Sequence, residues 1–157
     1  MKNRSSFYWV FLVSALCVFS SNIVFAASTS EEEIKAVISK IYDKPDLGVM
    51  TTPVAVVDNY ALADWTQGNR GGRALMQKIG DQWAVAACGA DGFKTLNYLE
   101  EAGIPTKTAE ALIVKLNELE KSVDPHRLHL FSLFGTPDDP NNMEEHHHHE
   151  THEQHTH

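Results

Sequence analysis

The sequence predicts one α+β domain, in which an N-terminal helix packs on a four-stranded antiparallel meander that is followed by C-terminal helices. Three observations lead to this prediction. Apolar residues recur at helical spacing in residues 31–41, four segments of strand character follow with short joints, and helical spacing returns after residue 92. Cystatin-like and nuclear-transport-factor-like domains are the fold analogy that this order of elements suggests.

The first helix is expected to begin at Ser30 and to end near Tyr42, before Pro45. Ser30 is a capping residue, three glutamates fill the first turn, and Glu33 has the capping-box position. One helical stripe is expected to face the sheet: Ile34, Val37, Ile38 and Ile41.

Four segments bounded by turn formers are predicted to be strands: residues 54–57, 60–66, 73–79 and 83–88. The pairs Asp58-Asn59 and Gly80-Asp81 are two-residue joints suited to hairpins, whereas residues 68–72 (GNRGG) predict a wider loop. The first helix should cover one face of this sheet. The alternation along residues 61–66 (ALADWT) predicts that the opposite face is partly solvated or paired.

Residues 92–102 are predicted to form a helix, and a longer helix should open at Thr106 or Thr108 and run through Val123. Its buried stripe is expected to contain Ala109, Leu112, Ile113, Leu116 and Leu119. Pro125 begins a last helical segment that extends to about residue 134. Three apolar side chains can dock this segment on the domain: Leu128, Phe131 and Phe134.

Residues 1–26 are predicted to be a secretory signal peptide. A basic start precedes the apolar run FYWVFLVSALCVF at residues 7–19, which is shorter than the roughly 20 residues that a membrane-spanning helix needs. Val24 and Ala26 fit a small-residue cleavage site, so cleavage is expected after Ala26. We therefore expect a soluble exported protein.

Export leaves an acidic chain with one cysteine. The signal contains two of the 13 Lys and Arg residues and no acid, so the remainder has 11 basic and 21 acidic residues and a formal net charge of −10. This charge argues against a nucleic-acid partner and favours cations. Cys88 is a buried small hydrophobe at the end of an apolar run, a metal ligand, or half of an intermolecular bridge that would make a homodimer.

The exported chain divides into a folded part at residues 27–134 and a C-terminal segment at residues 135–157. Turn formers at residues 135–142 (GTPDDPNN) predict disorder, and the final HHHHETHEQHTH contains seven of the nine histidines. The interruptions distinguish this tract from an affinity tag. Since imidazole is a common ligand for copper, zinc and nickel, we predict a metal-binding tail formed by His146, His147, His148, His149, His152, His155 and His157.

Secondary candidates lie elsewhere. Met143 can add a thioether ligand beside the histidine run, although the scattered methionines and Cys88 do not form a dedicated Cu(I) site. His126 and His129 are three residues apart, so they are either a second small site or solvated helix surface. Arg70 and Arg73, near the predicted loop, are candidates for contacting an acidic partner.

No catalytic residues are predicted. The segments HETH and HEQH place their second histidine at i+3, whereas the zinc-protease motif requires i+4 on a stable helix. Cys88 has no orienting group that would make it a nucleophile with a nearby histidine. The glycines at residues 68–72 do not open a helix, so they are not a phosphate-binding loop. We expect no enzyme activity and no organic cofactor.

Four motifs resemble a family of bacterial exported proteins described as copper uptake system-associated proteins. They are YALADWTQG at residues 60–68, GGRAL at 71–75, WAVAACGAD at 83–91 and GIP at 103–105. The likeness covers about residues 31–134, and family members also resemble this chain in having a signal peptide and often a histidine-rich tail. Ala90 departs from the pattern, in which glycine or a similarly small residue is expected. The resemblance implies a periplasmic role in copper handling, with an outer-membrane or periplasmic copper uptake protein as partner.

The sequence thus predicts a periplasmic metal-binding accessory protein that collects or buffers copper, or another transition metal, through its tail. The alternative is a cystatin-like protein-interaction or small-ligand-binding domain for which the tail is incidental. An apolar pocket with converging polar groups would favour that alternative.

Overall fold

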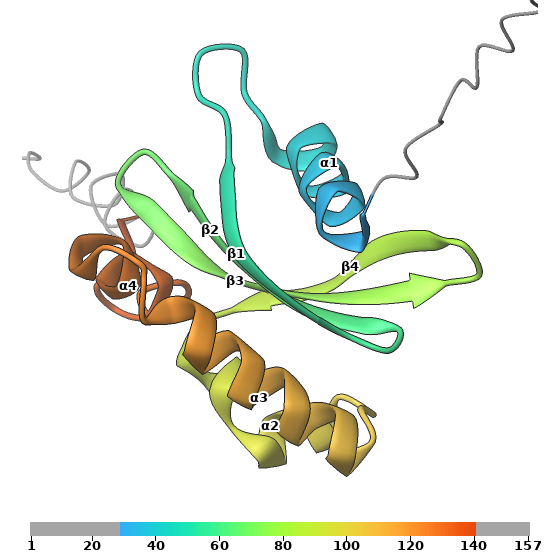
Figure 1. The fold of residues 1–157 in the computed structure, drawn as a ribbon. Helices are drawn as coiled ribbons and strands as arrows, with labels where there is room; N and C mark the ends of the chain where they lie inside the picture. Colours follow the sequence, from blue (N-terminus) through green and yellow to red (C-terminus); the bar gives the residue numbers. More distant parts are fainter. Residues whose placement is uncertain (1–28, 141–157) are drawn as a thin grey trace, which may run out of the picture.

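The computed structural model describes residues 29–140, which form an α+β fold on one curved antiparallel sheet (Figure 1). The strands follow one another as a meander: β1 (Met50–Val57), β2 (Tyr60–Gln67), β3 (Arg70–Ile79) and β4 (Gln82–Gly89). The helical elements are α1 (Ser30–Tyr42), η1 (Asp91–Lys94), α2 (Leu96–Glu101), α3 (Thr106–Glu120) and α4 (Pro125–Phe131). The predicted fold class and order of elements are confirmed.

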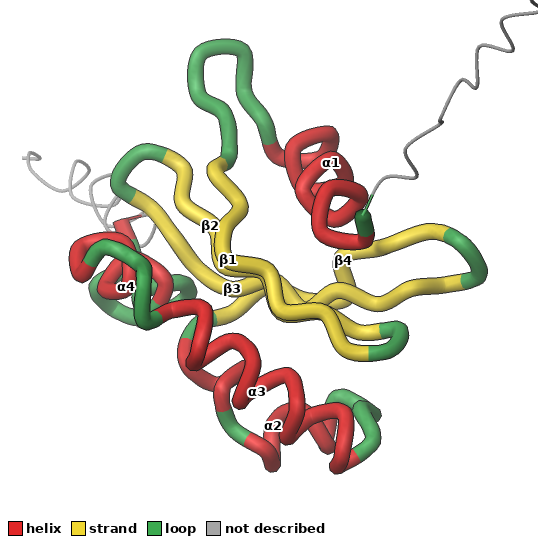
Figure 2. Tube along the Cα trace, viewed as in Figure 1, coloured by secondary structure: helices red, strands yellow, loops and turns green. Residues whose placement is uncertain are grey.

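Helices cover both faces of the sheet, with α1 on one side and α2, α3 and α4 on the other (Figure 2). Leu62 points to the α3 side, where it packs in one core with Leu112. Ala63, one residue along, points to the α1 side and packs in a second core with Ile38. Of the two alternatives predicted for the second face, solvated or paired, the structure has the second, because the C-terminal helices cover it and Asp64 pairs with Arg73.

β1, β3 and β4 begin earlier than the sequence predicts, whereas β2 begins at Tyr60 as predicted. β1 starts at Met50 and includes Pro53, which lacks a backbone N–H. The proline is tolerated there because it lies at a register shift of an edge strand, where a missing donor breaks no regular pairing. The loop predicted at residues 68–72 is a two-residue turn, and β3 already begins at Arg70, which pairs with Gln67. Gly68 takes a φ of 64°, which glycine adopts without strain.

Gly71 and Gly72 are strand residues that let the C-terminal segment approach the backbone closely. A Cβ atom on Gly71 would lie 2.8 Å from Leu130 Cβ and 2.9 Å from its carbonyl carbon, and one on Gly72 would lie 2.8 Å from Phe134 Cβ. Because neighbouring strand residues face opposite ways, the chain after α4 crosses from the α3 side to the α1 side here.

The N-terminal cap of helix α1 lies one residue earlier than predicted. Thr29 is the N-cap and Glu32 completes the capping box, in place of Ser30 and Glu33. Ile34 and Ile38 are buried as expected, whereas Ile41 is 55% exposed because it lies in the last turn, past the core.

The later helices also differ in detail from the prediction. The helix predicted at residues 92–102 is interrupted at Thr95, whose extended backbone separates η1 from α2. Helix α3 ends at Glu120, three residues early, and Leu119 is 37% exposed, whereas Glu120 is 6% exposed. The last turn of α3 thus presents a carboxylate to the interior.

The ordered chain continues past α4. The Gly135 amide donates to Asp139 Oδ2 at 2.8 Å, and Asp139 is 5% exposed. The predicted disorder is therefore wrong for residues 135–140, because this side chain closes a compact turn. Within residues 29–140, no helix combines the length and apolar character needed to cross a bilayer.

Gly71→Ala should destabilise the domain by about 1–3 kcal/mol, because the new methyl group meets the Leu130 backbone, which cannot rotate away. Gly48→Ala is the matched control, since its Cβ would meet only ordinary contacts at 3.7 Å or more. Urea denaturation measures both free energies of unfolding. Equal values for the two variants would contradict the close packing of α4.

Candidate functional site

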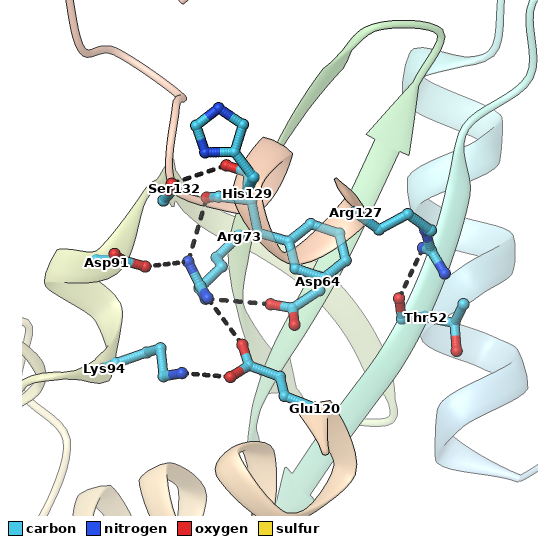
Figure 3. Close-up of polar contacts among 10 residues, drawn as sticks. Thr52, Asp64, Arg73, Asp91, Lys94, Glu120, Arg127, His129 and Ser132 are labelled. Carbon is cyan, nitrogen blue, oxygen red and sulfur yellow. Dashed lines mark hydrogen bonds and ion pairs between the residues drawn. The ribbon is translucent and has the colours of Figure 1, made fainter. Parts of the chain in front are cut away.

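Arg73 is the buried centre of a network of charged groups (Figure 3). Its Nη1 donates to Asp91 Oδ1 at 2.6 Å and to the Phe131 carbonyl at 3.1 Å, and its Nη2 donates to Glu120 Oε1 at 2.7 Å. Asp64, directly opposite on β2, places Oδ1 3.3 Å from Arg73 Nε. Lys94 completes the network with an ion pair to Glu120. The network joins the sheet to η1, α3 and α4.

The two buried carboxyl groups of the network, Asp64 and Glu120, differ in protonation, whereas the third, Asp91, is 67% exposed. Burial, followed by the charge of Glu120 and a hydrogen bond to it, outweighs the attraction of Arg73 and raises the pKa of Asp64 to about 8. For Glu120 burial acts in the same direction, but hydrogen bonds from Lys94 and Arg73 lower its pKa. Asp64 is therefore the protonated member at neutral pH and can donate to Glu120.

The prediction that Arg73 contacts an acidic partner is wrong. Its side chain is 3% exposed and its guanidinium is engaged by groups of its own chain. The error arose because residues 68–72 were expected to be a loop, so that Arg73 would lie near the surface. The strand pairing of Asp64 with Arg73 is the feature that would have revealed the ion pair.

A cavity of about 320 Å³ lies between α1 and the sheet. Its apolar walls include the side chains of Ile38, Trp65 and Phe134. Its polar lining residues are Tyr42, Gln67, Arg70 and Cys88. A partly enclosed apolar cavity with a few polar groups is the usual form of a small-molecule site.

Arg70 differs from the other arginines of the described residues. Arg127 donates to the Thr52 carbonyl at 2.9 Å and stacks on Phe131, and both terminal nitrogens of Arg73 donate to groups of the chain. Arg70 lines the cavity, and within residues 29–140 its guanidinium makes neither a hydrogen bond nor an ion pair; its buried Nε lacks a partner, as do the Nε atoms of Arg73 and Arg127. The prediction that Arg70 contacts an acidic group remains a prediction, and the position of its side chain would put that contact at the cavity.

Cys88 is half-buried at the cavity wall, neither fully enclosed nor fully exposed. Burial raises the pKa of its thiol, and a hydrogen bond from the Tyr42 hydroxyl offsets part of that effect. The thiol is therefore protonated at neutral pH, which makes it a poor nucleophile and a poor metal ligand without a compensating charge.

The remaining predicted ligands are not brought together. His126 and His129 lie on α4 and are exposed, and no group of three His, Cys, Asp or Glu residues within 29–140 is placed to hold a metal ion. Met143 and the seven tail histidines lie outside the described residues. No family model, curated protein or solved structure matches the chain.

Asp64→Asn should flatten the pH dependence of stability. Because the pKa of Asp64 is about 8 in the folded state and 3.8 as its ordinary value, the folded state binds more protons between these values. The contribution of Asp64 is present at low pH and is lost as pH rises toward 8, by up to about 1.4 kcal/mol per pH unit. The asparagine side chain imitates the protonated carboxyl group, so the variant should become more stable relative to the wild type as pH rises from roughly 4 to 8.

Urea denaturation across this pH range measures the difference. Asp91→Asn is the matched control, because Asp91 also contacts Arg73 but its side chain is 67% exposed. A constant difference between Asp64→Asn and the wild type at every pH would show that folding does not raise the pKa of Asp64.

Proposed function

We propose that this chain is an exported, non-enzymatic accessory protein that binds copper, or another transition metal, through the histidines of residues 146–157. The observation that supports the proposal is compositional: seven of nine histidines lie in the last twelve residues, among acidic neighbours. In an extended chain alternate residues share a side, so His146 with His148, and His155 with His157, can each chelate one ion.

The folded domain serves as a scaffold or docking module in this proposal. Its charged groups at Arg73 neutralise one another in the interior, and the thiol of Cys88 is held protonated. The two histidines of α4 lie on the surface without a third ligand in the described part of the chain. Metal binding is therefore assigned to the tail, and the domain to contact with a copper uptake protein of the same compartment.

Copper is the preferred ion for two reasons. Nitrogen ligands bind Cu(II) more tightly than Ni(II) or Zn(II) in the usual order of divalent affinities. The motifs at residues 60–68, 71–75 and 83–91 also resemble those of copper uptake system-associated proteins. Binding by several overlapping pairs, each of which must be ordered on binding, suits collection and transfer better than permanent storage.

Removing the tail should abolish metal binding without affecting the fold. A competition titration of Cu(II), Cu(I) and Zn(II) compares the chain from residue 27 with a version that ends at Met143. The longer chain should retain Cu(II) against a weak chelator, and the truncated one should not. A third protein, with His126→Asn and His129→Asn and an intact tail, is the matched control. The proposal fails if the truncated and full chains bind equally, or if neither competes.

Metal release should follow histidine protonation. Because imidazole binds metal only when neutral, the tail should lose Cu(II) as pH falls from roughly 7 to 5.5. Measuring bound copper after equilibrium dialysis at each pH gives the release curve. Full retention at about pH 5 would instead indicate sulfur ligands or a preformed site.

A further inference from the structure

We propose that the cavity between α1 and the sheet binds a small aromatic carboxylate, whose carboxylate group is received by Arg70. This site goes beyond metal binding, because it is formed by residues of the folded domain and requires none of the tail. Its support comes from the chemistry of the lining, the unpaired cation, and the rigidity of the walls.

The lining favours a flat apolar ligand. Three aromatic side chains, Tyr42, Trp65 and Phe134, line the cavity, and three aliphatic side chains extend this apolar surface: Ile38, Val49 and Ala74. Trp65 and Phe134 pack edge to face, with ring centroids 5.7 Å apart at 77°, which leaves ring faces available for stacking. The volume of about 320 Å³ lies at the lower end of ligand sites and suits one or two fused rings.

The charge of the cavity favours an anion. Arg70 is the only charged residue among the described residues that line it, and no carboxylate of the lining neutralises it. Unlike Arg73 and Arg127, whose terminal nitrogens donate to groups of the chain, Arg70 has no acceptor within residues 29–140, so its guanidinium is free to bind a ligand. A carboxylate matches the planar fork of a guanidinium, with two parallel hydrogen bonds, better than other anions of this size do.

The walls are fixed before any ligand binds. The Gln67 amide donates to the carbonyls of Tyr42 and Leu47, both at 2.9 Å, and so ties the loop after α1 to the sheet. Phe134 is held by its packing on Gly72 and Trp65. A preformed site loses little conformational entropy on binding, so the few contacts of a small ligand are enough to give measurable affinity.

Two matched probes test the proposal: 2-naphthoate and the isosteric neutral amide 2-naphthamide. Isothermal titration at pH 7 uses the chain from residue 27 to its C-terminus. We expect one equivalent of naphthoate to bind, about tenfold more tightly than naphthamide. Arg70→Gln should remove this preference while leaving naphthamide binding unchanged, and Arg70→Lys should restore part of it.

Control variants locate the site. Lys107→Gln removes the same charge from exposed α3, on the other side of the sheet, and should leave both affinities unchanged. Ala74→Leu fills the cavity from β3 and should abolish binding of both probes. Because Ala74 is buried and its replacement can impair folding, Val49→Phe, at a half-buried lining position, is the second filling variant, and urea denaturation verifies that each is folded.

Three outcomes would overturn the proposal. Absence of naphthoate binding up to about 1 mM would show that the cavity does not accept this class. Equal affinity for the two probes, or a preference that persists in Arg70→Gln, would remove Arg70 from the site. Unchanged binding in a folded filling variant would place the probe elsewhere. The truncation at Met143 is expected to bind naphthoate normally, so failure here and failure of metal binding are separable.

Discussion

The buried guanidinium of Arg73 is the contact on which the arrangement of the C-terminal half depends. It lies on β3 and binds groups from β2, η1, α3 and α4, so that five segments share one cation. A buried charge must be compensated by several partners, or its desolvation would outweigh the gain of folding. The positions of η1, α3 and α4 on the sheet are therefore coupled to one another through this side chain.

The same region determines the shape of the cavity on the opposite face. With α4 held by the Phe131 carbonyl, the chain can pass over Gly71 and Gly72, where no side chain obstructs it. Phe134 then reaches the α1 side and becomes a wall of the cavity. The chain from Phe131 to Phe134 thus connects the Arg73 network on one face of the sheet with the cavity on the other.

The two proposed binding functions use different chemistry. The tail offers many exchangeable nitrogen ligands, whereas the cavity offers aromatic surface and one unpaired cation. In the sequence, residues 135–145 separate the cavity wall at Phe134 from the histidine tract. The two proposed binding sites are therefore separated by a short stretch of the chain.

The sequence alone determined the order of the elements, because helical and strand periodicities and the turns at Asp58-Asn59 and Gly80-Asp81 are local properties. It also identified the histidines as the chief candidate metal ligands, because their clustering at the C-terminus can be read from the sequence without knowledge of the fold. Tertiary structure decided what Arg73, Gly71 and Glu120 do. An arginine beside two glycines resembles an exposed loop until strand pairing places Asp64 opposite it and α3 supplies Glu120. Arg73 forms three ion pairs, whereas Arg70 forms none within residues 29–140, and this contrast likewise depends on contacts between distant segments, which no local pattern encodes.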